Sequence, residues 1–367
     1  MKVYPFKCLY PNLSLIDSKE EFFSSVKNEY SEFKKAGLYL SEDSNAFYLY
    51  KVKGGSGEFR GLLVANDMDD IQNRKIKPHE KTLPAKEHLM MKFALERQAM
   101  IKPLLLGYDT NFELEAVFDI IESMPSFFNF KIERETHTVW KILETEMISR
   151  IQKLFDMKIK EAYIADGHHR LSTALLIYNN PKIIQNIQKP IRTLSLYLPF
   201  SDLKIYDYNR IIQLQAGVSP AKLLAELSLK AIIEPLPDAQ KPLQKFDFCV
   251  YIDRKWYRCR WKNSILANYQ SEDPILDVAI LNQELVKDIL KLKDYELTYF
   301  VQFIPGTMSF TDFERSTHKT KNAFGVILHP VSIEELKSVA DQEKVFPAKS
   351  TWFEPRVLNG VVSLELN

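Results

Sequence analysis

The residue types best suited to chemistry gather at residues 166–170, which read Asp-Gly-His-His-Arg. The apolar stretch 162–165 before them is typical of a buried strand, and residues 171–177 after them have helical character. A turn that opens a helix presents unpaired N–H groups and the positive end of the helix dipole, and both favour a bound anion. The pattern therefore predicts a phosphate-binding turn.

Each member of this turn has a role in that prediction. Gly167 permits a tight turn, Arg170 can bind a phosphate through two N–H groups, and His168 and His169 can donate, accept or move protons. Asp166 can cap the helix or hold Mg²⁺. A structural interpretation, with Asp166 as an N-cap and Arg170 in an ion pair, is open at each position alone. Five such residues in a row favour a site.

A second candidate segment covers residues 77–82, Lys-Pro-His-Glu-Lys-Thr, which we expect to form a loop before a polar helix that begins near Pro84. Glu80 is the carboxylate there that can act as a general base or hold a metal. Lys77 and Thr82 can contact a phosphate or substrate. A solvated loop that caps the following helix explains the segment equally well.

A third candidate segment lies near the end of the chain. Lys349, Ser350 and Thr351 offer a cation and two hydroxyls, and Trp352 offers a flat apolar face, so the segment can hold a nucleotide or a small polar substrate. The alternative, which we favour for this segment alone, is a staple between two domains in which Trp352 and Phe353 are buried.

Composition narrows the class of protein. The 367 residues carry a net charge of +1 and are 46% hydrophobic, which is typical of a folded protein with no global attraction to nucleic acid. No stretch approaches the ~20 apolar residues of a spanning helix, so we expect a cytoplasmic protein without a membrane partner. The three cysteines form no Cys-x-x-Cys pair, which argues against a disulfide framework and a structural zinc site.

The periodicity predicts a mixed α+β fold. Helices are expected at residues 20–36, 109–124 and 140–157, and strands at 45–52, 59–65, 192–198 and in a hairpin over 246–261. The glycine-rich residues 54–57 lie between two strands with no helix after them, which excludes a phosphate loop there. A change of character near residue 200 divides the chain into domains 1–200 and 201–367, and we expect the second α/β domain to cover the site of the first.

Six ordered landmarks together resemble the bacterial family called domain of unknown function 1015, over nearly the whole chain. They are Pro5-Phe-Lys7, Lys77-Pro-His-Glu-Lys-Thr82, Tyr163-Ile-Ala-Asp-Gly-His-His-Arg170, Asp207-Tyr-Asn-Arg210, Leu276-Asp-Val-Ala-Ile-Leu281 and Lys349-Ser-Thr-Trp-Phe-Glu-Pro355. Asn209 and Arg210, within the fourth landmark, are added to the candidate substrate-binding residues. The Pro-Pro-Tyr-Asp stretch that members usually carry near the start is absent between Leu9 and Phe33.

Residues 166–170 and 78–80 are also similar, more distantly, to motifs of the ParB/sulfiredoxin-like fold, which includes free-serine kinases. The resemblance implies such a fold for residues 1–200. It further implies that Glu80 is the base that deprotonates an attacking hydroxyl and that His168, His169 and Arg170 contact nucleotide phosphates. Asp166 would lie near Mg²⁺ or the substrate.

These inferences lead to a phosphotransferase that uses ATP or ADP with Mg²⁺ and a small hydroxylated metabolite, with free L-serine as the first choice of acceptor. The alternative is a ParB-like regulatory protein in which CTP or ATP switches a clamp on DNA or a protein partner, although the neutral charge makes nucleic acid a poor candidate. A sulfiredoxin-like reductase is disfavoured because the turn has no cysteine. A metal-dependent hydrolase lacks an evident third ligand.

Overall fold

The computed structural model describes residues 1–55, 57–82, 84–184, 191–293 and 296–366. The chain forms two compact units. Unit 1 comprises Met1–Lys204 and Phe353–Asn367, and unit 2 comprises Ile205–Trp352. The interpretation from sequence divides the chain once, at residue 200, whereas the chain leaves unit 1 after Lys204 and returns to it at Phe353. The final residues return because β21 (Ser363–Glu365) pairs with β2 (Cys8–Pro11) near the start of the chain.

Unit 1 is built on a nine-stranded sheet with the order β6-β11-β8-β12-β5-β4-β10-β9, to which β1 is added beside β5. Its strands are β1 Val3–Tyr4, β4 Phe47–Gly54, β5 Gly57–Asp67, β6 Ile76–Lys77, β8 Leu104–Tyr108, β9 Phe128–Ile132, β10 Glu135–Ile142, β11 Ala162–Asp166 and β12 Arg192–Pro199. A smaller sheet has the order β3-β2-β21-β7, with β3 at Tyr39–Ser41 and β7 at Ala99–Met100. The strands β8 and β12 are apolar and buried almost throughout, as expected in the middle of a sheet that is covered on both faces.

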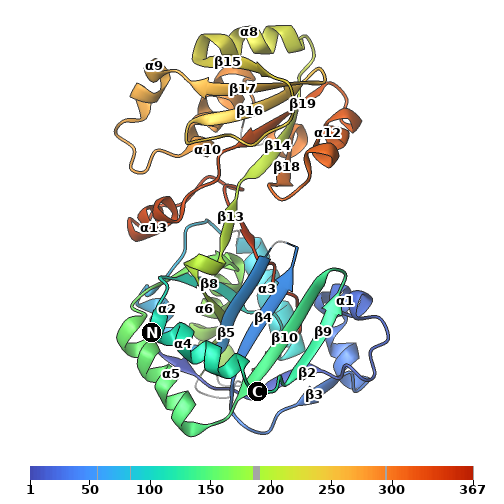
Figure 1. Ribbon diagram of the computed structural model, residues 1–367, viewed down its shortest axis with the longest axis vertical. Helices are drawn as coiled ribbons and strands as arrows, with labels where there is room; N and C mark the ends of the chain where they lie inside the picture. The colour runs from blue at the N-terminus through green and yellow to red at the C-terminus, as the bar shows by residue number, and fades with distance from the viewer. Residues whose placement is uncertain (56, 83, 185–190, 294–295, 367) are drawn as a thin grey trace. The chain divides into compact units, whose positions relative to one another are not determined.

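Seven α-helices occur in the described part of unit 1, together with the 3₁₀ helix η1 at Phe200–Asp202. They are α1 Lys19–Lys35, α2 Met68–Gln72, α3 Pro84–Arg97, α4 Phe112–Glu122, α5 Thr145–Lys158, α6 His168–Tyr178 and α7 Pro181–Ile184. Figure 1 shows α4 and α5 in front of the sheet and α3 behind its strands. The side chains of α4 and α5 pack with those of β4, β5 and β8 in one continuous hydrophobic core.

The helix predicted over residues 140–157 is wrong at its start. Trp140 and Ile142 lie in β10, where they pair with Leu49 and Phe47 of β4, and the helix α5 begins only at Thr145. The alternation of buried and half-buried residues along β10 is the strand period of two. The sequence did not show where the strand ends and the helix begins, because apolar residues occur on both sides of this boundary.

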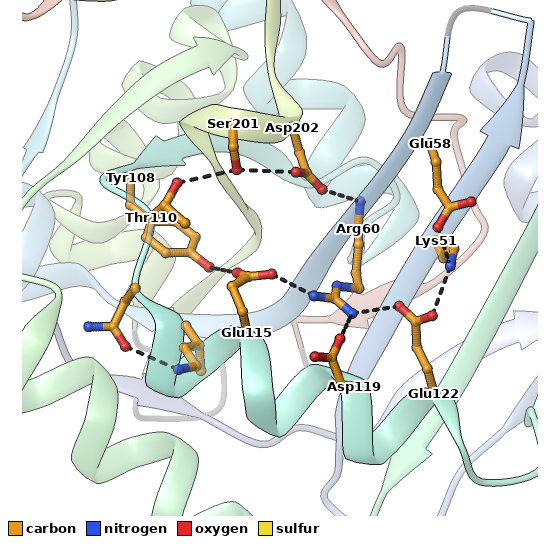
Figure 2. A network of polar contacts seen from close by, with 12 residues as sticks. Lys51, Glu58, Arg60, Tyr108, Thr110, Glu115, Asp119, Glu122, Ser201 and Asp202 are labelled. Carbon is orange, nitrogen blue, oxygen red and sulfur yellow. Dashed lines mark hydrogen bonds and ion pairs between the residues drawn. The ribbon is translucent and has the colours of Figure 1, made fainter.

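A charged network joins α4 to the sheet (Figure 2). The Arg60 guanidinium on β5 donates to the carboxylates of Glu115 at 2.6 Å, Asp119 at 2.6 Å and Glu122 at 3.0 Å, all on α4. The Lys51 ammonium on β4 adds a bond to Glu122 at 2.8 Å. Three successive turns of α4 are therefore fixed to neighbouring strands by one arginine and one lysine.

Unit 2 contains a six-stranded sheet with the order β15-β17-β16-β19-β14-β18. Its strands are β14 Tyr208–Gln213, β15 Ala231–Leu236, β16 Asp247–Ile252, β17 Lys255–Trp261, β18 Val301–Pro305 and β19 Ala323–Leu328. Its helices in the described residues are α8 Pro220–Lys230, α9 Asn263–Leu266, a 3₁₀ helix η2 Ala267–Tyr269, α10 Asp277–Ile280, a π-helix Leu281–Ile289, α11 Leu297–Phe300, α12 Phe310–Lys319 and α13 Ile333–Asp341. The chain passes between the units through β13 (Lys204–Tyr206) and β20 (Trp352–Glu354). The mixed α/β class predicted from the sequence is confirmed.

Candidate functional site

Two of the three candidate segments lie side by side in unit 1. The strands β6 and β11 are parallel neighbours, with Ala162 beside Ile76 and Tyr163 beside Lys77. Because parallel strands end at the same edge of a sheet, the loop 77–82 after β6 and the turn 166–170 after β11 meet at that edge. The pairing explains how residues far apart in the sequence can form one site.

Gly167 makes the turn possible. Its φ of +117° is a conformation that L side chains rarely adopt, and it forms the N-cap of α6 without a side-chain hydrogen bond to the helix among the described residues. A Cβ atom at this position would lie 2.8 Å from Nη2 of Arg170. Glycine is therefore favoured by the backbone, and a side chain there would also have to displace the flexible end of Arg170. The N-cap supplies no side-chain acceptor to the first-turn N–H groups of α6, which suits an anion at this end of the helix.

Asp166 does not cap α6. Its carboxylate accepts a hydrogen bond from Nη2 of Arg170 at 3.1 Å, and it lies 3.4 Å from the Lys102 ammonium and 3.7 Å from the Arg356 guanidinium. Burial alone would raise the pKa of Asp166, but the charges of Arg170, Lys102 and Arg356 outweigh it and hold the pKa well below its usual range. Three cations thus gather around one carboxylate at the start of the helix.

This environment does not fit the Mg²⁺ role considered for Asp166. A divalent ion bound by this carboxylate would sit beside three like charges, which is unfavourable at such distances. Within the described residues, no group of three or more His, Cys, Asp and Glu side chains could hold a metal ion. Asp166 is therefore poorly suited as a ligand of Mg²⁺.

His168 links the turn to the loop 77–82. The backbone N–H of His79 donates to Nε2 of His168 at 3.3 Å, while Nδ1 of His168 lies 3.8 Å from the Glu80 carboxylate. Burial lowers the pKa of His168 to about 4, so its ring is neutral near pH 7. Because Nε2 accepts a hydrogen bond, we infer that Nδ1 carries the proton and points it toward Glu80. His168 is then suited to orient Glu80.

His79 supports this arrangement from inside the unit. Its ring meets that of His168 edge to face, with centroids 4.4 Å apart, and lies 5.9 Å from the ring of Phe353. Burial lowers the pKa of His79 well below the usual value for histidine. His79 is thus a buried neutral ring that holds His168 in place, while the Glu80 side chain remains 39% exposed.

The other predicted residues of these two segments take different positions. Within the described residues, Nδ1 of His169 and Nε of Arg170 are buried and have no hydrogen-bond partner in the protein. The Lys77 ammonium instead forms an ion pair with Glu161 and lies 5.5 Å from the ring centroid of Tyr163. The Thr82 hydroxyl meets that of Ser172 on α6 at 3.2 Å.

Asn209 and Arg210 lie on β14 of unit 2, and both are buried. Arg210 donates to the carbonyl of Tyr208 at 2.9 Å, forms an ion pair with Asp207 at 3.7 Å and lies over the ring of Phe303. Burial, only partly opposed by Arg210, raises the pKa of Asp207 to about 8. These contacts are those of a packed interior, and the substrate-binding role of Asn209 and Arg210 stays a prediction.

The third candidate segment divides at Trp352. Lys349 lies over the ring of Tyr208 with its ammonium 5.1 Å from the centroid, and Ser350 donates to the carbonyl of Pro347 at 2.6 Å. Trp352 meets Tyr208 edge to face and is only half-buried, whereas Phe353 is 3% exposed in unit 1. The expectation that both aromatics are buried is therefore wrong for Trp352. Thr351, which precedes them, is likewise half-buried.

Reasoning from the sequence did not single out two members of the site, Lys102 and Arg356. Lys102 follows the short strand β7, and Arg356 follows the landmark 349–355 by one residue. Lys102 has no neighbour in sequence that suggests phosphate chemistry. Only the tertiary structure shows that Lys102 and Arg356 both lie beside the Asp166 carboxylate.

The model of the family described as "Protein of unknown function (DUF1015)" matches residues 9–279. The chain belongs to this family. The resemblance to the DUF1015 family inferred from six landmarks is thereby confirmed. No curated protein is significantly similar to the chain in sequence.

Several solved structures are similar at a distance. A mutant free serine kinase in complex with ADP has a TM-score of 0.39 and 11% identity, and the match covers 82% of this chain and 92% of that one. SbnI with a C-terminal truncation, from Staphylococcus aureus, gives 0.43 and 13% over 81% of this chain and 85% of its own. A conserved hypothetical protein from Pyrococcus furiosus has a TM-score of 0.38 and 14% identity, and the match covers 81% of this chain and 90% of that one.

In the part of this DUF1015 chain that the structure describes, no helix has the length and apolar character needed to cross a membrane.

Proposed function

We propose that this DUF1015 protein is a nucleotide-dependent phosphotransferase that acts on a small hydroxylated metabolite, with free L-serine as the first acceptor to test. The observation that carries the proposal is the meeting of Glu80 with the Gly167 turn. An uncapped helix N-terminus and Arg170 offer a phosphate site, and the Glu80 carboxylate, 3.8 Å from Nδ1 of His168, offers a base beside it.

In the proposed reaction the phosphates of ATP or ADP bind the first-turn N–H groups of α6 and the side chains of Arg170 and His169. The acceptor hydroxyl lies beside Glu80, which takes its proton as the oxygen attacks the terminal phosphorus. The new P–O bond forms as the bond to the bridging oxygen breaks, and the shortened nucleotide leaves with the bridging oxygen. When bound with the nucleotide, Mg²⁺ would neutralise phosphate charge.

The protein residues supply orientation and charge. Lys102, Arg170 and Arg356 set three positive charges against the single negative charge of Asp166, so the cluster favours an incoming anion. The inferred Nδ1 proton of His168 faces the Glu80 carboxylate from 3.8 Å, so His168 would favour the orientation in which this carboxylate points toward the turn. His168 and Asp166 thus act as positioning residues, while Glu80 and Arg170 contact the reactants.

Two variants separate binding from transfer. Arg170→Ala should weaken nucleotide binding by about 100-fold, because Arg170 would donate charge-assisted hydrogen bonds to a phosphate. Glu80→Gln should keep nucleotide affinity within about threefold and lose turnover by about 100-fold or more, as expected for the loss of a general base. Calorimetry measures the first and formation of the shortened nucleotide the second. Full turnover in Glu80→Gln would exclude Glu80 as the base.

A further inference from the structure

A cavity of about 540 Å³ lies beside the turn, between α3 and α6 of unit 1. This volume is within the range of about 300–1,000 Å³ that is usual for small-molecule sites. Much of its wall is apolar and comes from α3, β8 and α6. The apolar lining includes Leu89, Met90, Phe93, Leu104, Ala174 and Ile177.

The charged side chains of the cavity all have one sign. Among the described residues, the lining contains five cationic side chains and no carboxylate. The cations are Lys27, Lys86, Arg97, Lys102 and Arg170. Free serine does not match this wall, because its ammonium would face only positive charges. The cavity instead suits an anion that also carries a sizeable apolar or aromatic body.

The cavity is continuous with the phosphate turn through Arg170, which belongs to both. Ala174 and Ile177 follow Arg170 at spacings of four and seven residues, so the three side chains lie along one face of α6. A ligand whose phosphates bind at the start of α6 can therefore extend its body along this face under α3. Glu80, which lies beside His168, is not among the lining residues.

The helix α3 provides the cover of this cavity. None of its residues from Pro84 to Arg97 is buried, and Leu89 and Phe93, which line the cavity, are 52% and 37% exposed. A ring that fills the space beneath α3 would bury these side chains and gain the free energy of removing their surface from water.

We propose that the cavity between α3 and α6 binds the nucleoside part of the nucleotide, with its base against Phe93 and Ala174 and its phosphates at Arg170. This inference rests on the proposed function. The nucleotide donor then binds in the cavity, and the hydroxylated acceptor binds at the part of the turn that faces Glu80. The two substrates therefore occupy different places.

The test compares ADP with inorganic tripolyphosphate, which has the phosphates without the nucleoside, by titration calorimetry on the full chain. Ala94→Trp places an indole in the cavity from the half-buried face of α3, and Met91→Trp, on the same helix but outside the lining, is the matched control. Ala94→Trp should weaken ADP binding by about 10-fold or more and leave tripolyphosphate within about twofold, since a blocked pocket removes only the nucleoside contacts. Met91→Trp should change neither, and Leu89→Trp provides a second obstruction at an exposed position.

The outcomes separate this inference from the proposed function. If both ligands bind the unaltered protein and neither Ala94→Trp nor Leu89→Trp affects ADP, the nucleoside lies elsewhere and this inference fails while nucleotide binding stands. Equal weakening of ADP and tripolyphosphate would place the phosphates in the cavity and also overturn it. If neither ligand binds the unaltered protein, the proposed function itself fails. Circular dichroism confirms that each variant is folded.

Discussion

Gly167→Ala tests whether the turn holds Arg170 in place. At a φ of +117° an alanine is strained by about 1–3 kcal/mol. Its Cβ would also lie 2.8 Å from Nη2 of Arg170, so the guanidinium must move away from its 3.1 Å bond with Asp166. That bond joins two partly exposed charges, and its loss adds about 1 kcal/mol. The free energy of unfolding of unit 1 should thus fall by about 2–4 kcal/mol.

The matched control is Gly37→Ala in the same unit. Gly37 has a φ of +76°, but a Cβ there meets no atom within 4 Å, so the substitution adds backbone strain without a collision. Its cost should be about 1–2 kcal/mol. Urea unfolding followed by circular dichroism measures both variants, and calorimetry with tripolyphosphate measures binding.

The displacement of Arg170 should also appear in binding. Gly167→Ala should weaken tripolyphosphate binding about 10-fold, which is about 1.4 kcal/mol, because Arg170 no longer faces the ligand. Gly37→Ala should leave this affinity unchanged. Equal losses of stability in the two variants, together with equal affinities, would refute the reasoning that Gly167 is needed for the position of Arg170.

Three further predictions concern the charged interior. Arg60→Ala should lower the free energy of unfolding in urea by about 2–3 kcal/mol, which is less than the usual ~3–5 kcal/mol for a broken buried pair because Asp119 is exposed. The control Lys35→Ala removes an exposed charge and should cause no measurable loss. Equal losses in the two variants would contradict a stabilising role for the network. Burial and the nearby Glu335 charge raise the pKa of Asp277 to about 7, so its stabilising contribution is present below about pH 4 and is lost as pH rises through about 7. Asp277→Asn should therefore reduce the dependence of the unfolding free energy of unit 2 on pH, measured by fluorescence. An unchanged pH dependence would exclude Asp277 as its source. Burial lowers the pKa of His168 to about 4, so unit 1 should lose stability as pH falls from about 6.5 toward 4. His168→Gln should reduce that loss. A stability of unit 1 that stays constant over this pH range would contradict a neutral buried ring at His168.

Local sequence patterns were sufficient to predict the strand, turn and helix at residues 162–178. A continuous apolar strand, one glycine and a helical run are near neighbours, so short-range geometry determines their arrangement. The proximity of the loop 77–82 to this turn came from family resemblance, and its physical cause is the parallel pairing of β6 with β11. No periodicity in the sequence reveals which strands pair.

The charge cluster shows why the rest of the site could not be predicted. Lys102, Asp166 and Arg356 are brought together by the segment before β8, the end of β11 and the final segment of unit 1, and Lys102 is an ordinary charged residue in its own local sequence. The role of His168 was also open, because its burial and its two contacts, with His79 and Glu80, depend on tertiary structure. The sequence left Asp166 open as a helix cap or a metal ligand, and its three cationic neighbours were not foreseen.

The substrate-binding role considered for Arg210 illustrates a different limit. A polar landmark such as Asp207-Tyr-Asn-Arg210 can mark a ligand site or a buried ion pair, since both place unusual residues in a strand. In unit 2 the arginine is 1% exposed and contacts Asp207, Tyr208 and Phe303. The residue types alone do not distinguish the two uses.

The most direct test of the central claim is ³¹P NMR of the purified protein with Mg²⁺, ATP or ADP and a pool of hydroxylated metabolites that includes L-serine, run beside Glu80→Gln. We predict a new phosphomonoester signal with the unaltered protein and none with Glu80→Gln, and its chemical shift would identify the acceptor. Nucleotide binding with no transfer to any member of the pool would contradict the phosphotransferase account and favour a ParB-like nucleotide switch.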